Sequence, residues 1–183
     1  MTYNTSDKNK TASISNYPTS KLFVQEKDTV NNGPIADISL IPAAGRLLAI
    51  DPGTKRIGIA VSDELRVTTR PLEVITRTNW KSLLLSVKNI VAEFDAKALV
   101  IGLPLESDGT ESEMSAYARD IARKFALSLD IPVILQDERV TSYEAKSRLW
   151  SRGKSVKETR REVDSEAAAI ILADLIDRLS SRS

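Results

Sequence analysis

The chain has 183 residues and a nearly balanced charge, with 26 Lys and Arg against 25 Asp and Glu. It contains no His and no Cys, which excludes disulfides, thiolate nucleophiles, Ser-His-Asp triads and metal sites built from imidazole or thiolate. Any catalysis must therefore use carboxylates, Lys, Tyr, Ser or Thr, or a metal ion held by oxygen ligands. There is no long apolar segment and no secretory signal pattern, so we expect a cytoplasmic protein without membrane contact.

Residues 1–45 differ in composition from the rest of the chain. They are rich in Ser, Thr, Asn and Lys and carry only scattered apolar residues, so they cannot bury enough surface to offset the entropy of ordering. We predict a disordered N-terminal extension over residues 1–45 and a single domain over residues 46–183. A targeting leader is the weaker alternative, because transit peptides are rich in Arg and this stretch has none.

The first part of the domain predicts three strands joined by turns. The apolar run 46–51 is typical of a strand that is buried on both faces. The turn 52–55 leads into a second strand over residues 57–62, and Pro71 opens a third over residues 72–76. Strands joined by short turns are expected to pair antiparallel.

The second part of the domain alternates helices with strands. Apolar residues from Trp80 to Phe94 recur at helical spacing, and Asn79 or Thr78 can cap that helix. Strands separated by helices run parallel, so we predict an α/β fold with a mixed five-stranded sheet and helices on its faces. The remaining predicted elements are a strand over 98–102, a helix between Met114 and Phe125, a strand over 132–136, a helix over 142–150, a polar loop over 151–162 and a last helix that begins near Asp164.

Acidic side chains follow the predicted strands or begin the last helix. Asp51 ends the first strand, Asp137 and Glu138 follow the strand 132–136, and Asp164 precedes an apolar helical face. Since these strands end at one edge of the sheet, two or three carboxylates would meet there and repel unless a cation lies between them. Without His or Cys, that cation would be Mg²⁺ or Mn²⁺. Two such ions can activate water and stabilise the leaving oxygen in phosphodiester cleavage.

Each acidic position also has a purely structural interpretation. Asp51 would hydrogen-bond the backbone of the following turn, and Asp164 would be an N-cap; position alone favours neither role over the other. The segment 137–139 would be a charged strand end neutralised by its own Arg. For Glu106 and Asp108, a turn containing Pro and Gly is the simpler explanation.

A basic segment lies just before Asp164. It carries seven cations against the single acid Glu158, and such a local excess is typical of a phosphate-binding surface. A solvated helix face or loop is the ordinary alternative, although the position of the segment favours the functional interpretation. Its basic residues are Lys146, Arg148, Arg152, Lys154, Lys157, Arg160 and Arg161.

Four motifs, taken in order, resemble the YqgF family of pre-16S rRNA nucleases, which are related to Holliday-junction resolvases. They are Asp-Pro-Gly-Thr-Lys-Arg-Ile-Gly-Ile-Ala at 51–60, Gly-Leu-Pro-Leu at 102–105 with Asp-Gly-Thr at 108–110, Asp-Glu-Arg at 137–139, and Val-Asp-Ser at 163–165. The resemblance covers about residues 46–183 and implies an RNase H-like fold. It also implies metal-dependent phosphodiester hydrolysis, with Asp51, Glu138 and Asp164 as catalytic residues and metal ligands, and Asp137 as the alternative to Glu138.

The resemblance implies a function in ribosome biogenesis. The chain would be an endonuclease that uses Mg²⁺ or Mn²⁺, in a site that suits two ions, to mature the 5′ end of 16S rRNA. Its substrate would be the free precursor RNA or a ribosomal precursor particle. The residues expected to hold the RNA backbone are Lys55, Arg56, Arg139, Arg152, Lys154, Arg160 and Arg161.

Three other functions compete with this interpretation. A resolvase acting on branched DNA would use the same chemistry. A nucleic-acid-binding module would keep the basic surface without catalysis. An actin-like phosphotransferase would also begin with a motif like 51–54, but it needs a second domain, for which residues 46–183 leave no room.

Overall fold

The computed structural model describes residues 35–106, 108–137 and 156–181, and only the backbone of residues 156–163. Short strands form one mixed sheet in the order β3-β2-β1-β5-β6, with β4 also paired to β2. Strand β1 is antiparallel to β2 and parallel to β5, which is parallel to β6. The strands are β1 Leu47–Pro52, β2 Arg56–Ser62, β3 Thr69–Pro71, β4 Ile75–Thr76, β5 Ala98–Leu103 and β6 Val133–Asp137; the helices are η1 Ile38–Leu40, α1 Trp80–Phe94, α2 Glu113–Ala126 and α4 Val156–Ser180.

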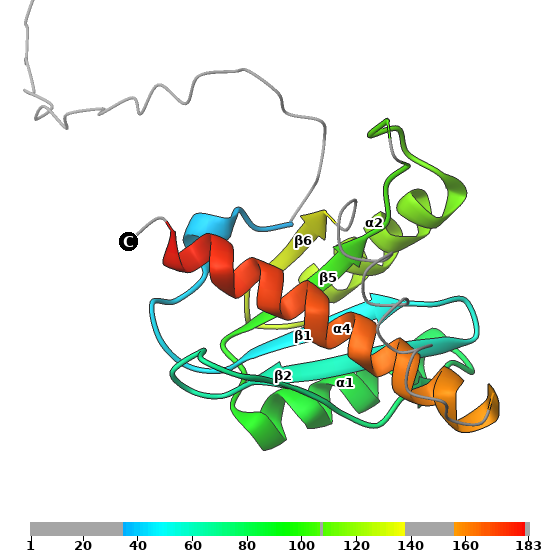
Figure 1. The fold of residues 1–183 in the computed structure, drawn as a ribbon, viewed down its shortest axis with the longest axis horizontal. Helices are drawn as coiled ribbons and strands as arrows, with labels where there is room; N and C mark the ends of the chain where they lie inside the picture. Colours follow the sequence, from blue (N-terminus) through cyan, green and yellow to red (C-terminus); the bar gives the residue numbers. More distant parts are fainter. Residues whose placement is uncertain (1–34, 107, 138–155, 182–183) are drawn as a thin grey trace, which may run out of the picture. The chain divides into compact units, whose positions relative to one another are not determined.

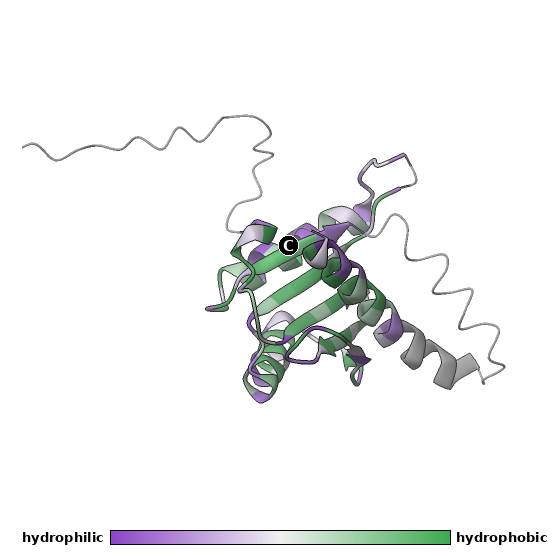
Figure 2. Cartoon of the chain, turned by 60° about the vertical axis from the view of Figure 1, so that its left-hand side comes forward, coloured by the Kyte–Doolittle hydropathy of each residue, from purple (hydrophilic) through white to green (hydrophobic). Residues whose placement is uncertain are grey.

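Helices cover both faces of this sheet. Figure 1 shows α4 crossing one face over β1 and β2, whereas α1 and α2 lie on the other. The strands are apolar along most of their length, and the helices turn their apolar sides toward them (Figure 2). The α/β class and the change from antiparallel to parallel strands are those predicted for an RNase H-like fold.

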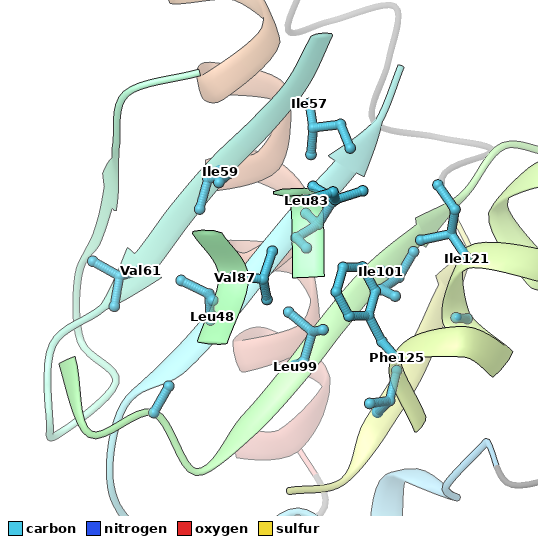
Figure 3. Close-up of a cluster of buried hydrophobic side chains, with 14 residues drawn as sticks. Leu48, Ile57, Ile59, Val61, Leu83, Val87, Leu99, Ile101, Ile121 and Phe125 are labelled. Atoms are coloured by element: carbon cyan, nitrogen blue, oxygen red, sulfur yellow. The ribbon is translucent and has the colours of Figure 1, made fainter. Parts of the chain in front are cut away.

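The face beneath α1 and α2 is filled by large side chains. Figure 3 shows Ile59, Leu99 and Ile101 of the sheet facing Leu83 of α1 and Phe125 of α2. The ring of Phe125 is completely buried. The bounds of α1 are those predicted from its apolar stripe, and the N–H of Ser82 donates to the side chain of Asn79 at 2.9 Å, as expected for an N-cap.

The face beneath α4 combines Leu and Ile with several alanines. Strand residues alternate between faces, and those that face α4 include Ala49, Ala60 and Ala98, all completely buried. The helix meets them with Ala168 and Ala169 among its buried residues. Small residues on both sides let the axis of α4 approach the sheet closely.

The predicted third strand, residues 72–76, is wrong in its bounds. The pairing with β2 is made by β3, which precedes the predicted range, and by β4 at its end, so the sheet has six strands rather than five. Ala60 pairs with Pro71 but Ile57 pairs with Ile75, which leaves one extra residue on the outer strand. This is a β-bulge, a feature common at sheet edges.

The predicted start of the last helix near Asp164 is also wrong. Helix α4 begins at Val156, so Asp164 lies inside the helix and is not its N-cap. Residues 156–163 include Lys, Arg and Glu, which are good helix formers. Their polar composition instead led to the prediction of a loop over residues 151–162. The predicted helix 142–150 lies outside the described residues. No helix in the part of the chain that is described is both long and apolar enough to cross a membrane.

The packed structure begins before residue 46. Ile35, Ala36 and Ile38 pack against the sheet domain, and Ile41 is buried. The backbone N–H of Ala36 donates to the carbonyl of Val133 at 2.8 Å, on the outer side of β6. The predicted extension is therefore packed from Ile35 onward, and residues 1–34 lie outside the described structure.

Candidate active site

Asp51 lies near the end of β1, on the face covered by α4. Alternation along the strand places it with Leu47 and Ala49, which pack in the cluster beneath α4. The side chain is half-buried. Because β1, β5 and β6 are parallel, their carboxyl ends lie at this same edge of the sheet.

Gly58 brings α4 to this edge. It pairs directly with Asp51 across the β1–β2 ladder. A Cβ at Gly58 would lie only 1.8 Å from the backbone oxygen of Asp164, so only a glycine permits this approach. The backbone of Asp164 therefore lies over the residue that is the direct cross-strand neighbour of Asp51.

Asp164 forms an ion pair with Arg56, the first residue of β2. Nε of Arg56 is 2.8 Å from Oδ2 of Asp164, and the two side chains are 35% and 29% exposed. The contact lacks hydrogen-bond geometry: Oδ2 is buried and accepts no hydrogen bond from the described residues. Asp164 thus presents a buried carboxylate oxygen that a cation balances but no hydrogen-bond donor satisfies.

The other predicted carboxylates are not all brought to this point. Asp137 ends β6 and alternates with Val133 and Leu135, which pack on the α1 and α2 side, so it lies on the face opposite Asp51. Glu138 lies outside the described residues. Among the residues that are described, no group of three acidic side chains could hold a metal ion.

The predicted cations are only partly described. Lys55 is exposed in the turn after β1, and Arg56 makes the ion pair with Asp164. For Arg160 and Arg161 only the helical backbone is described. The remaining predicted cations, Arg139, Lys146, Arg148, Arg152 and Lys154, lie outside the described residues, and of Lys157 the backbone alone is described.

The loop after β5 supports the structural interpretation of Asp108. Its carboxylate accepts the backbone N–H of Thr110 at 2.9 Å and the hydroxyl of the same residue at 2.7 Å. These bonds lower the pKa of Asp108, the hydroxyl bond most. The N–H of Gly109 donates to the carbonyl of Glu106 at 2.8 Å, so the segment is a turn closed by its own groups.

Two residues that the sequence interpretation did not single out lie near this edge. Gly58 lies between isoleucines in a predicted strand, and an isolated glycine there is a recognised sign of close backbone approach. The other is Arg77, whose backbone N–H donates to the carbonyl of Lys55 at 3.0 Å. No pattern in the sequence distinguishes Arg77 from the other basic residues of the chain.

The motifs that meet at this edge belong to a known family. Residues 45–178 match the family described as "RuvX: Holliday junction resolvase". The chain belongs to the RuvX family. RuvX is the family also called YqgF, so the resemblance drawn from the sequence motifs is confirmed. Membership in RuvX indicates a nuclease, a hydrolase of phosphodiester bonds.

Curated relatives agree with this assignment. A protein of Anaeromyxobacter dehalogenans named "Putative pre-16S rRNA nuclease" is 41% identical over 133 residues, which cover 73% of this chain and 97% of the relative. A protein of the same name from Rickettsia peacockii is 36% identical over 142 residues, covering 78% and 92%. The RuvX chain thus spans nearly the whole length of these relatives.

Solved structures show more distant similarity. RuvC of T. thermophilus in complex with a Holliday junction substrate aligns with a TM-score of 0.45 and 16% identity, covering 75% of this chain and 95% of the other. The fowlpox virus resolvase bound to Holliday junction DNA aligns with a TM-score of 0.41 and 10% identity, covering 73% and 98%.

Proposed function

We propose that this RuvX chain is a metal-dependent endonuclease that matures the 5′ end of 16S rRNA. One observation carries the proposal: Gly58 brings Asp164, with its unsatisfied Oδ2, onto the face and edge of the sheet where Asp51 lies near the end of β1. Two half-buried carboxylates so arranged favour a cation between them. Relatives named pre-16S rRNA nucleases support the choice of RNA.

Asp51 and Asp164 fit a divalent metal. Both offer carboxylate oxygens, which Mg²⁺ and Mn²⁺ prefer, and a buried oxygen without a hydrogen-bond donor is suited to a metal ligand. We assign Glu138 as the third ligand, since Asp137 alternates onto the opposite face. The bound metal would supply activation of water and stabilisation of the leaving oxygen.

Arg56 neutralises Asp164 in the protein without metal. A guanidinium at 2.8 Å supplies the positive charge that a partly buried carboxylate needs. Arg56 is also exposed enough to reach a backbone phosphate when it leaves Asp164. Together with Lys55 it would hold the RNA strand beside the carboxylates, and Arg139, Arg152, Lys154, Arg160 and Arg161 would extend that contact.

The test is cleavage of a 16S precursor fragment that carries its 5′ extension, compared with a four-way DNA junction. We expect Mg²⁺ or Mn²⁺ to support cleavage of the RNA and Ca²⁺ or EDTA to abolish it. Asp51→Asn and Asp164→Asn each remove a ligand charge and should reduce cleavage by at least a hundredfold. Mapping the product ends by primer extension shows whether the cut falls at the mature 5′ end.

Asp177→Asn is the matched control, because Asp177 is an exposed carboxylate on the same helix as Asp164. It should cleave like the parent protein. Preferred cleavage of the junction would assign the chain to DNA resolution instead. Binding of RNA without metal-dependent turnover would leave only a nucleic-acid-binding module. Equal cleavage by Asp164→Asn would remove Asp164 from the site.

A further inference from the structure

A second cationic contact lies on the opposite side of the sheet edge from α4. The guanidinium carbon of Arg77 lies 4.6 Å from the centroid of the Tyr117 ring. This is the shortest of the cation–ring contacts in the described structure, the others being 5.6 Å for Arg70 over Phe94 and 6.0 Å for Lys124 over Trp80. Stacking on an aromatic ring holds the guanidinium plane in one orientation.

Both partners are fixed to the edge where Asp51 lies. The backbone N–H of Arg77 donates at 3.0 Å to the carbonyl of Lys55, in the turn that follows β1. Tyr117 lies in the first half of α2, and the hydroxyl of Ser115 in the same helix donates to the carbonyl of Pro104, the residue after β5. The pair is thus tied to the segments that leave β1 and β5.

The charge of Arg77 is not balanced by a carboxylate within the described structure. No carboxylate of the described residues lies within 4 Å of it, whereas Arg46, Arg56 and Arg119 each have one. Lys55 is likewise without an acidic partner among the residues described. Two cations without anions beside a nuclease site are suited to binding phosphate.

The hydroxyl of Tyr117 also lacks a partner. It is buried and makes no hydrogen bond to any described residue, which is costly for a hydroxyl unless a further group supplies an acceptor. Burial raises the pKa of Tyr117 above its ordinary value of 10, so the group remains a protonated donor at neutral pH. Because the hydroxyl is covered by protein atoms, the inference rests on Arg77 and its contact with the ring rather than on this hydroxyl.

We infer that Arg77, positioned by the ring of Tyr117, binds a backbone phosphate of the nucleic acid on the α1 and α2 side of the site. The inference rests on the proposed function, since it takes the substrate to be a nucleic acid. Arg56 lies against α4, and Arg77 lies on the other side of the same edge. The substrate backbone would therefore contact both sides of the sheet edge.

The test measures binding rather than cleavage. A labelled RNA hairpin with a 5′ single-stranded extension, and a DNA hairpin of the same sequence, are titrated with protein in EDTA over a series of salt concentrations. Arg77→Gln should weaken binding of both probes about threefold or more at moderate salt and lower the salt slope by about one, because one fewer counterion is released. Tyr117→Leu should have a similar effect on affinity, and Tyr117→Phe a smaller one.

Arg70→Gln is the matched control. Arg70 also stacks on a ring, but it lies in β3 opposite Val61, which pairs with Leu48 at the start of β1. It is therefore at the other end of the strands from Asp51, and Arg70→Gln should leave affinity and salt slope unchanged. An unchanged slope with Arg77→Gln, or an equal loss with Arg70→Gln, would overturn the inference. An effect on RNA alone would also overturn it, because a phosphate contact does not distinguish RNA from DNA.

The same series separates this inference from the proposed function. Thermal unfolding of each variant shows that the binding change is not loss of fold, and Arg77→Lys, which keeps the charge, should retain most of the salt slope. Loss of binding by Arg77→Gln in a protein that never cleaves would refute the nuclease and keep the phosphate contact. Normal binding by Arg77→Gln in a protein that does cleave would support the nuclease and refute the phosphate contact of Arg77.

Discussion

The two faces of the sheet differ in how closely the helices approach the strands. Beneath α1 and α2, large side chains such as Phe125 and Ile101 fill the space between sheet and helices. Beneath α4, alanines and Gly58 let the helix backbone approach the strands. The face beneath α1 and α2 holds most of the bulky apolar side chains. The face beneath α4 places Asp164 over the strand that pairs with Asp51.

The two faces of the sheet should therefore respond differently to substitution. A core of large residues tolerates small changes of shape, because neighbours can shift a little to fill the space. Where a helix backbone lies directly on a strand backbone, no side chain can adjust, so only a movement of the whole helix makes room. We therefore expect substitutions of similar size to have unequal effects on the two faces.

The largest effect is expected from Gly58→Ala. A Cβ there would lie 1.8 Å from the backbone oxygen of Asp164, so α4 must move away, at a cost of about 3 kcal/mol or more in the free energy of unfolding. Ile59→Val removes one methyl group from the opposite face and should cost about 1 kcal/mol. Urea unfolding of the two variants compares the faces directly; a smaller cost for Gly58→Ala would refute the close packing of α4.

A smaller effect is expected from Arg56→Gln. Without metal it leaves the buried Oδ2 of Asp164 without a cation, and we expect a loss of about 1 kcal/mol, because the pair is partly exposed and screened. Added Mn²⁺ should then raise the melting temperature of the variant more than that of the parent, since Arg56 no longer competes for Asp164.

The control for Arg56→Gln is an ion pair on the other side of the molecule. Asp120→Asn breaks the exposed pair between Asp120 and Lys124 on α2 and should cost less than about 0.5 kcal/mol. It should also leave the response to Mn²⁺ as in the parent. If Mn²⁺ raises the melting temperature of the parent and of Arg56→Gln equally, Arg56 and the metal do not compete for the carboxylate of Asp164.

The smallest effect is expected at the far edge of the sheet. The carboxylate of Asp63 accepts the backbone N–H groups of Val67 and Thr68, at 2.7 and 2.8 Å, and these bonds, that of Thr68 first, lower its pKa. This stabilisation is present above the pKa of the unfolded chain, near 3.8, and is lost as the pH falls through the lower value in the folded protein. Asp63→Asn should therefore melt slightly earlier than the parent at pH 7, and the difference should vanish in strong acid. A difference that persists at low pH would mean that the carboxylate charge is not its cause.

Regular elements with complete apolar patterns were predictable from the sequence. The stripe from Trp80 to Phe94 predicts α1 to the residue, and the apolar runs predict β1, β5 and β6 within a residue or two. The continuity of the third strand was not predictable, because a β-bulge depends on pairing with β2 and not on local composition.

The site was predictable as a set of residues but not as a geometry. The motifs single out Asp51 and Asp164, and strand order explains why Asp51 lies at the ligand-binding edge. The Arg56–Asp164 ion pair joins residues that are far apart in the sequence, and no spacing rule predicts it. The roles assigned to Glu138 and to the basic segment remain predictions, since those side chains are outside the described structure.

The segment from Ile35 to Ile41 has a consequence for the handling of this protein. It lies ahead of the part that matches the family, yet Ala36 donates a hydrogen bond to the outer side of β6, the last strand of the sheet. An uncovered outer strand offers its backbone groups to strands of other molecules and so promotes aggregation. A chain shortened to the family boundary would lose this hydrogen bond and expose the carbonyl of Val133 on the outer side of β6, so we expect it to self-associate more readily than a chain that keeps residues 35–41.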